Sequence, residues 1–582
     1  MNRVLPIFKN PLLWFALLLA YFTVDNNLLE GEFKNVIRSD GRGYYAYLPA
    51  AFLYNDPTFE SSLEAETQNA QPNFNQYYLY QNAEGRRFNK YFPGIAVMQT
   101  PFFAAGCLAA VVSGAPVDGY SEPFEFAFLL GSLFYSLMGL WLLYRCIQLR
   151  FPDLKSIASW LTILIYTATT LLIYNTVTLG LSHHYSFFLF GLFTYLILRF
   201  KDTEKRKYVI GIGLTLGLIV LVRPTNLLVI LGIPLLFDNW KELKRALIIL
   251  FLNKARLFLM AIGAFVLVVF LQFVLWKWQS GNWITWSYSG EGFNFSHPAF
   301  LENLIGFRNG LFLHSPIVLI SAICAAILLF KNKFTASFWW IYFLINAWVI
   351  SSWWCWDYET SFGNRPFTEH SFFLLIPLIQ VFKSQRKWLW TSFGVFALLG
   401  LIRYGSYVSG YMIDQRFTSE NYISSLAVWN DENFGRWRYA RSVVPFGDRT
   451  DEAILAYNQN VQRITSNDEF IQTVEYDTPA NRTTERMYFR VWLEKKSKQP
   501  LENVSLVIHA TDSDSDFNHY HAIPLYNDRF AGINNWTSLS FSGQIPDHFN
   551  DFEKVKIYIW NQGKETFELR NIRIFIDTYK SL

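Results

Sequence analysis

Long apolar segments alternate with short basic stretches over roughly the first 400 residues of the chain. A helix needs about 20 apolar residues to cross a bilayer, and clusters of Lys and Arg stay on the cytoplasmic side. Placing all basic clusters on that side predicts about eleven membrane-spanning helices, near residues 11–29, 124–145, 156–175, 184–200, 208–222, 226–237, 257–276, 313–330, 335–352, 367–382 and 388–404. The N-terminus then lies in the cytoplasm, its apolar segment is a retained first helix, and the C-terminal part lies outside.

One further apolar run, Phe92 to Gly114, contains Pro93 and Pro101. If this run crossed the membrane, every later basic cluster would change sides, against the positive-inside rule. We therefore expect a helix that lies at the outer interface or dips into it.

The apolar spans stop after about Tyr411, and residues 487–577 contain several short runs in which apolar and polar residues alternate. This period of two, interrupted by turn residues, is typical of β-strands with one buried face. We predict a jelly-roll-like β-sandwich. The domains are then a transmembrane domain over 1–404 with a large first outer loop at 30–123, a connecting segment over 405–480, and the sandwich over 481–582.

Composition supports a polytopic α-helical membrane protein with a soluble domain attached. The chain is 52% hydrophobic and 16% charged, whereas soluble domains are about 25% charged. Its four cysteines lie far apart, without the spacing of metal ligands, so we expect them to be unpaired.

Asp40 is the first candidate for chemistry. It follows the first apolar segment in Ser-Asp-Gly-Arg-Gly-Tyr-Tyr, which brings an acid, two glycines, Tyr44 and Tyr45 to the place where a membrane helix emerges into water. A carboxylate in such a place can act as a base on a substrate that arrives from the aqueous side. The alternative is that Asp40 caps the helix that begins near Tyr44.

Cations and hydrogen-bond donors recur in the other outer loops. They are Lys90, Tyr91, His183, His184, Arg223, Arg308 and Arg365. Each alone is most often an interfacial anchor or a lipid-headgroup contact. Together with Asp40 they predict a site for an anionic, lipid-borne group, because a guanidinium group matches the geometry of phosphate and an ammonium group adds a point charge.

The outer loop from Trp353 to Pro366 joins aromatic side chains to charged ones. Trp354, Trp356, Asp357 and Glu359 lie in it. Such tryptophans commonly form an interfacial belt, but rings beside carboxylates also suit a sugar. Asp357 and Glu359 could hold a divalent metal, as could Asp512, Asp514 and Asp516, although this acidic run lacks the glycine and glutamate of a calcium loop. We expect no cofactor.

The pattern over about residues 10–400 resembles the GT-C superfamily of membrane glycosyltransferases, in its protein O-mannosyltransferase and lipid A aminoarabinose transferase branch. The matching features are Asp40 in the first outer loop, Lys90 to Pro93, the turn Arg223-Pro224, the stretch Gly310 to Pro316, and the loop Trp353 to Arg365. Three features differ from the family. Gly41 follows Asp40 where protein O-mannosyltransferases carry an Asp-Glu pair, His183-His184 replaces an acidic residue of some relatives, and the β domain lies outside the common core.

The resemblance implies transfer of a sugar from a polyprenyl-phosphate donor to an acceptor hydroxyl on the outer, periplasmic face of the inner membrane. Asp40 is then the general base, and direct displacement by one base predicts inversion. The donor phosphate is expected near Arg223, Lys90, His184 and Arg365. Sugar or acceptor contacts are expected from Tyr44, Tyr45, Tyr91, His183, Trp354, Trp356, Asp357 and Glu359.

The expected partners are this donor, membrane lipid, and a glycan, lipid or protein acceptor; no nucleic acid is expected. Two other functions fit parts of the pattern. A transporter or flippase of a lipid-linked sugar could use the same cations, but no charge lies clearly at mid-span and no inverted repeat is evident. A surface receptor whose β domain binds a glycan would need only a single anchor.

Overall fold

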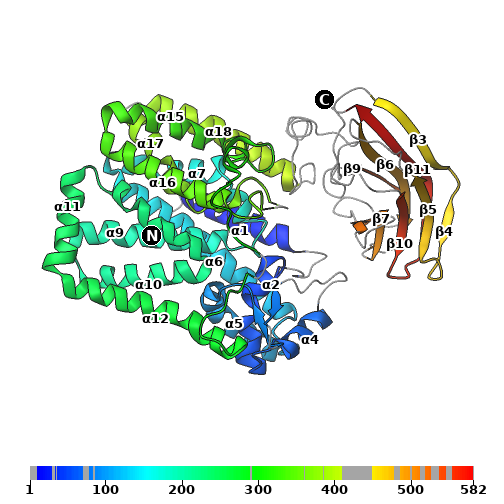
Figure 1. Ribbon diagram of the computed structural model, residues 1–582, viewed down its shortest axis with the longest axis horizontal. Coiled ribbons are helices and arrows are strands. Elements are labelled where there is room, and N and C mark those ends of the chain that lie inside the picture. The colour runs from blue at the N-terminus through cyan, green and yellow to red at the C-terminus, as the bar shows by residue number, and fades with distance from the viewer. Residues whose placement is uncertain are drawn as a thin grey trace, which may run out of the picture. The chain divides into compact units, whose positions relative to one another are not determined.

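The computed structural model describes residues 10–28, 33, 36–69, 78–82, 85–288, 291–358, 361–383, 386–408, 449–477, 485–498, 501, 503–511, 518–525, 536–545 and 554–580. The chain divides into two compact units, Met1–Leu401 and Ile402–Leu582. Helices build the first unit and strands build the second (Figure 1).

The longer helices are α1 (Pro11–Asn27), α5 (Gly94–Ser113), α6 (Glu122–Arg150), α7 (Ala158–Ala168), α9 (His183–Thr203), α10 (Arg206–Val222), the 3-10 helix η3 (Pro224–Leu236), α12 (Ala255–Ser280), α15 (Pro316–Lys331), α16 (Lys333–Ser351), α17 (Ser371–Phe382) and α18 (Arg386–Val408). Shorter elements connect them: α2 (Asp40–Tyr45), α3 (Tyr47–Pro49), η1 (Ala50–Tyr54), α4 (Glu60–Asn69), η2 (Pro152–Ile157), α8 (Leu171–Tyr174), α11 (Trp240–Ile248), η4 (Ile249–Asn253), α13 (Phe300–Ile305), α14 (Leu311–His314) and η5 (Arg365–Phe367). A small hairpin pairs β1 (Leu79–Gln81) with β2 (Arg87–Asn89).

Prolines and glycines explain several helix ends. Pro11, Pro224 and Pro316 occupy the first turns of α1, η3 and α15, where the missing amide hydrogen costs no helical hydrogen bond. Gly281 ends α12 with φ +82°, a left-handed conformation that glycine adopts without strain.

Four of the described helices, α5, α6, α12 and α16, are long and apolar enough to cross a membrane by length and composition. The predicted number of about eleven spans is therefore not confirmed, and η3, α15 and α17 are apolar but shorter. Only 6% of the most apolar stretch of α12 is buried. An apolar surface of this extent is stable only when something other than water covers it, so α12 indicates a membrane protein.

Helix α5 covers the run that the sequence analysis assigned to the outer interface. Gln99 of α5 donates to the carbonyl of Phe128, and Gly106 lies against Phe124 and Ala127. Later residues of α5 thus meet earlier residues of α6, so the two helices pack antiparallel. α5 therefore runs alongside α6, which is long and apolar enough to cross a membrane, rather than across it.

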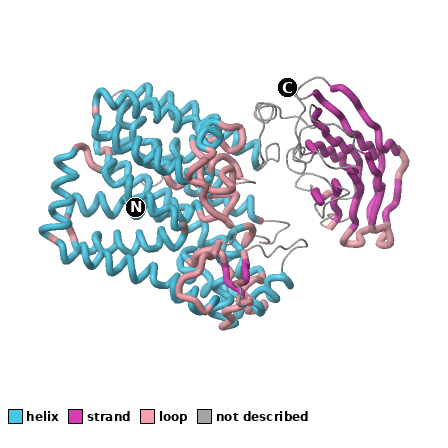
Figure 2. Tube along the Cα trace, viewed as in Figure 1, coloured by secondary structure: helices cyan, strands magenta, loops and turns pink. Residues whose placement is uncertain are grey.

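The second unit is an antiparallel sandwich of two sheets (Figure 2). One sheet has the order β5 (Phe470–Asp477), β10 (Lys554–Asn561), β7 (Val504–Thr511), β8 (Asn518–Pro524). The other has the order β3 (Arg449–Asn458), β11 (Phe567–Lys580), β6 (Glu485–Ser497), β9 (Thr537–Ile545), with the short strand β4 (Gln462–Ile464) beside β11. When the strands of this unit are counted from β3 and β4 is left out, the sheet β3-β11-β6-β9 consists of the first, eighth, third and sixth strands. This is the jelly-roll arrangement.

Alternation along the strands builds the sandwich core. In β10, Val555, Ile557 and Ile559 are buried while Lys554 and Lys556 face outward, as a period of two requires. The first described strand of this unit begins at Arg449, inside the segment predicted as a connection over 405–480. The sequence prediction missed β3, β4 and β5.

Candidate functional site

A cavity of about 710 Å³ lies where several helices of the first unit end. Its lining follows the C-terminal ends of α10, α12 and α16 and includes the start of α2. The charged side chains that line it are Asp40, Lys90, Arg223, Glu291 and Arg365. Its size is within the usual range of about 300–1,000 Å³ for ligand pockets.

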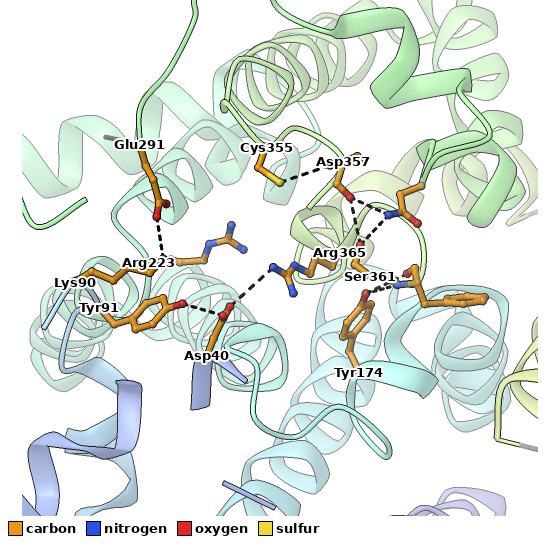
Figure 3. A network of polar contacts seen from close by, with 12 residues as sticks. Asp40, Lys90, Tyr91, Tyr174, Arg223, Glu291, Cys355, Asp357, Ser361 and Arg365 are labelled. Atoms are coloured by element: carbon orange, nitrogen blue, oxygen red, sulfur yellow. Dashed lines mark hydrogen bonds and ion pairs between the residues drawn. The ribbon is translucent and has the colours of Figure 1, made fainter. Parts of the chain in front are cut away.

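Asp40 is the first residue of α2 and lines this cavity (Figure 3). The Tyr91 hydroxyl donates a 2.8 Å hydrogen bond to Asp40 Oδ1. Arg365 Nη2 lies 3.8 Å from Asp40 Oδ2. A carboxylate offers about four lone-pair positions, so Asp40 keeps acceptor capacity beyond the bond from Tyr91.

Two glycines allow the segment that carries Asp40 to pack closely. A Cβ added at Gly41 would lie 2.7 Å from the carbonyl oxygen of Gly180, and one at Gly43 would lie 2.3 Å from the Tyr91 ring. Both distances are shorter than van der Waals contact, so neither position has room for a side chain. Asn89 adds a 2.6 Å hydrogen bond to the Gly43 carbonyl.

Lys90 is held in an ion pair. Its Nζ lies 2.9 Å from Glu291 Oε1, and that same oxygen accepts a 3.2 Å hydrogen bond from the Tyr80 hydroxyl. The ammonium group also lies 5.2 Å from the centre of the Tyr91 ring and 5.8 Å from that of Tyr288. Glu291 thus neutralises the charge that was predicted to bind phosphate.

Arg223 and Arg365 share one aromatic ring. Their guanidinium carbons lie 5.7 and 5.5 Å from the centre of the Tyr358 ring, within the range of cation–π contacts. Arg223 Nη1 lies 3.7 Å from Glu369 Oε1. Burial opposes the charge of Arg365, but Asp40 and neighbouring tyrosines raise its pKa above the ordinary value. Burial likewise opposes the charge of Arg223, but Tyr358 and Glu369 raise its pKa, so both arginines are cationic.

Aromatic side chains form much of the remaining wall. They are Tyr44, Tyr80, Tyr91, Phe92, Trp276, Trp286, Tyr288, Phe293, Trp353, Trp354 and Tyr358. A bridge between Phe293 and Trp353 joins the loops after α12 and α16, which supply most of them. Burial raises the pKa of the Tyr288 hydroxyl well above its usual range, so it is a neutral donor. Rings and hydroxyl groups of this kind suit a sugar.

The structure brings together most of the residues that the sequence analysis selected. Eight of them line the cavity: Asp40, Tyr44, Lys90, Tyr91, His183, Arg223, Trp354 and Arg365. Trp356 and Asp357 are not among the lining residues. Asp357 instead pairs with Arg308, whose Nη1 lies 3.8 Å from Asp357 Oδ2, and Glu359 lies outside the described residues.

Two of the selected residues point into the protein instead. Tyr45 is 2% exposed and donates a 2.7 Å hydrogen bond to the carbonyl of Gly119, so its predicted contact with a ligand does not fit. His184 is fully buried beside Tyr185, and neither ring nitrogen has a hydrogen-bond partner among the described residues. It lies outside the cavity lining, which does not fit a role at the phosphate.

Sequence reasoning assigned no role to two residues that organise the site, Tyr358 and Glu369, and it did not foresee the partner of Glu291. Tyr358 lies in the loop already noted for its tryptophans, but nothing in the sequence joins Glu291 to Lys90. Glu369 was placed inside a predicted span at 367–382, whereas α17 begins at Ser371. Its position beside Arg365 and His370 was the available signal.

Among the described residues, no three His, Cys, Asp or Glu side chains form a group that could hold a metal ion. Asp512, Asp514 and Asp516 lie outside the described part of the chain. The cavity therefore offers the Asp40 carboxylate, the guanidinium groups of Arg223 and Arg365, the Lys90–Glu291 ion pair and an aromatic wall.

No family model and no curated protein sequence matches the chain. Among solved structures, the arabinosyltransferase EmbB from Mycobacterium smegmatis, determined by single-particle cryo-EM, is similar over 92% of this chain. The identity is 9% and the TM-score 0.31, and the match covers 64% of that chain. A likeness at this level carries no argument about function, which has to come from the residues of the cavity.

Proposed function

We propose that the protein is a membrane glycosyltransferase that moves a sugar from a polyprenyl-phosphate donor to an acceptor hydroxyl. The observation that carries this proposal is that one cavity, at the ends of apolar helices, is lined by the Asp40 carboxylate and the guanidinium groups of Arg223 and Arg365. A base for the acceptor and cations for a leaving phosphate are thus within one site. The sequence resemblance to the GT-C superfamily supports the same assignment.

In the proposed reaction the acceptor hydroxyl donates a hydrogen bond to Asp40. The acceptor oxygen forms a bond to the anomeric carbon while the bond from that carbon to the phosphate oxygen breaks. The electron pair leaves with the phosphate, and Asp40 takes the hydroxyl proton. A positioned base of this kind contributes typically about 10²–10⁴-fold in rate, and a single displacement inverts the anomeric carbon.

Arg223 and Arg365 stabilise the charge that develops on the phosphate. Fixed cations at such a position count for more in a site shielded from water than in bulk solvent. Lys90 contributes less to the phosphate than the sequence analysis expected, because Glu291 already pairs with it at 2.9 Å. The aromatic wall, with Tyr44, Tyr288 and Trp354, is the proposed sugar platform.

In this proposal the cavity faces the outer, periplasmic side of an inner membrane, with the N-terminus in the cytoplasm. The lipid part of the donor remains in the bilayer, and the acceptor comes from the cell envelope.

The test is release of free polyprenyl phosphate from a panel of polyprenyl-phosphate sugars, with cell-envelope extract as acceptor. Purified wild type, Asp40→Asn and the control Glu122→Gln, which removes an exposed carboxylate at the start of α6, are compared. We expect release by wild type and control and at least a ~10²-fold loss in Asp40→Asn, with donor binding retained. Release by Asp40→Asn at the wild-type rate contradicts the assignment, and donor binding without any release supports transport instead.

A further inference from the structure

Glu369 is a fully buried carboxylate beside the cavity. Its side chain is 0% exposed and it lies just before α17, in the segment that also supplies Arg365. A buried charge is stable only when partners compensate for the lost hydration. The charge of Glu369 is therefore stable in this position only because of the side chains that contact it.

Each carboxylate oxygen of Glu369 has its own partners. Oε2 lies 2.9 Å from His183 Nδ1. Oε1 accepts a 3.3 Å hydrogen bond from Asn226 Nδ2 and lies 3.7 Å from Arg223 Nη1. The partners come from three different segments: the start of α9, the turn after α10, and η3.

All three partners line the cavity. One buried anion thus lies against three neighbouring side chains of the same wall, at hydrogen-bond distance from His183 and Asn226 and at ion-pair distance from Arg223. The bond at His183 Nδ1 also selects the ring orientation and leaves Nε2 as the nitrogen that can meet a ligand. Arg223, which is 21% exposed at its side chain, is held from behind while its other donors remain available.

We propose that Glu369 is a positioning residue that holds Arg223, together with His183, against the phosphate of the bound donor. This inference rests on the proposed glycosyl transfer from a polyprenyl phosphate. Glu369 acts through Arg223, because its own carboxylate repels a phosphate and lies behind the cavity wall.

The test measures binding of farnesyl monophosphate to the full-length protein in detergent, followed by the fluorescence of the tryptophans that line the cavity, such as Trp276 and Trp354. The variants are Glu369→Gln, Arg223→Ala and the double variant. Thr368→Val is the matched control, since it removes a buried 2.8 Å hydrogen bond to Thr170 from the adjacent residue without touching the cavity. Farnesol, which lacks the phosphate, is titrated in parallel.

We expect Glu369→Gln to weaken farnesyl monophosphate binding about tenfold and the double variant to bind within about twofold of Arg223→Ala alone, because residues acting through one another are not additive. Farnesol binding and the Thr368→Val control should match wild type. Unchanged phosphate binding in Glu369→Gln, losses that multiply in the double variant, or an equal loss for farnesol each overturn the inference.

Glu369→Asp and wild type provide two further comparisons of farnesyl monophosphate binding. If Glu369→Gln does not fold, Glu369→Asp keeps the charge but draws it back from its partners, and wild-type phosphate binding in that variant overturns the inference. If wild type itself does not bind farnesyl monophosphate, the proposed function fails and the inference fails with it. Normal wild-type binding combined with an unaffected Glu369 variant refutes the positioning role alone.

Discussion

The short helix that carries Asp40 is tied to a buried carboxylate whose charge depends on pH. Glu66 of α4 is 4% exposed. Its Oε2 accepts a 2.6 Å hydrogen bond from Tyr78, and its Oε1 lies 3.7 Å from Nε of Arg42, which belongs to α2. Burial raises the pKa of Glu66 from 4.5 to about 7, although Tyr78 and Arg42 oppose the change.

This raised pKa has a definite consequence for stability. The folded protein binds the Glu66 proton more tightly than the unfolded chain does, so the stabilisation is complete below about pH 4.5 and is lost as the pH rises through about 7. A difference from 4.5 to about 7 corresponds to about 3 kcal/mol, at 1.36 kcal/mol for each tenfold change in proton affinity. The Glu66→Gln variant cannot ionise and should not lose this contribution.

The assay is unfolding of the purified protein in detergent between about pH 5 and about pH 8.5, where Glu66 changes charge and linkage acts. The stability of Glu66→Gln minus that of wild type should increase with pH by up to about 3 kcal/mol and level off above about pH 8. Glu64→Gln, an exposed position on the same helix, controls for the loss of one charge. Parallel curves for Glu66→Gln and wild type over the whole range refute the reasoning.

Two other variants test the packing and the charges of the site. Gly43→Ala makes a methyl group overlap the Tyr91 ring, so we expect about 1–3 kcal/mol of destabilisation and loss of turnover. Gly263→Ala, where nothing lies within 4 Å, should be neutral. Equal melting curves for the two variants contradict the packing argument. Lys90→Met leaves Glu291 without its cation and should lower the free energy of unfolding by about 1–3 kcal/mol. The double variant Lys90→Met/Glu291→Gln should recover most of this loss. Its donor affinity should stay within about threefold of wild type, because only Arg223 and Arg365 are assigned to the phosphate. A double variant less stable than Lys90→Met refutes the pairing.

The β domain could be predicted from alternation only where its strands have one fully buried face. β10 and β11 lie inside their sheets, and their alternating runs were recognised. β3 and β5 lie at sheet edges, and in β5 only Ile471 is buried. Edge strands pack less of their surface and carry more polar residues, so their pattern was too weak to separate them from a connecting segment.

The site could be predicted as far as the loops expected on the outer side supplied its residues, because loops on one side of a membrane lie near one another. Two failures have one cause. Tyr44 and His183 line the cavity while their neighbours Tyr45 and His184 are buried in the core. Consecutive residues of a helix point in directions about 100° apart, so adjacent residues rarely serve one pocket. The pairing of Lys90 with Glu291 was beyond prediction, because no local pattern links positions so far apart.

The three cations of the cavity differ in how firmly their counter-ions hold them. Lys90 is in direct contact with Glu291 at 2.9 Å, whereas Arg223 and Arg365 lie 3.7 and 3.8 Å from Glu369 and Asp40. The two longer distances exceed those of a hydrogen bond, so both guanidinium groups keep donors for another anion. In the proposed reaction, a phosphate bound to Arg365 would compete with Asp40 for this guanidinium group and would leave the carboxylate to the acceptor hydroxyl. Under the proposed function we therefore expect the donor to bind before the acceptor, since the donor would free the base as well as supply the sugar.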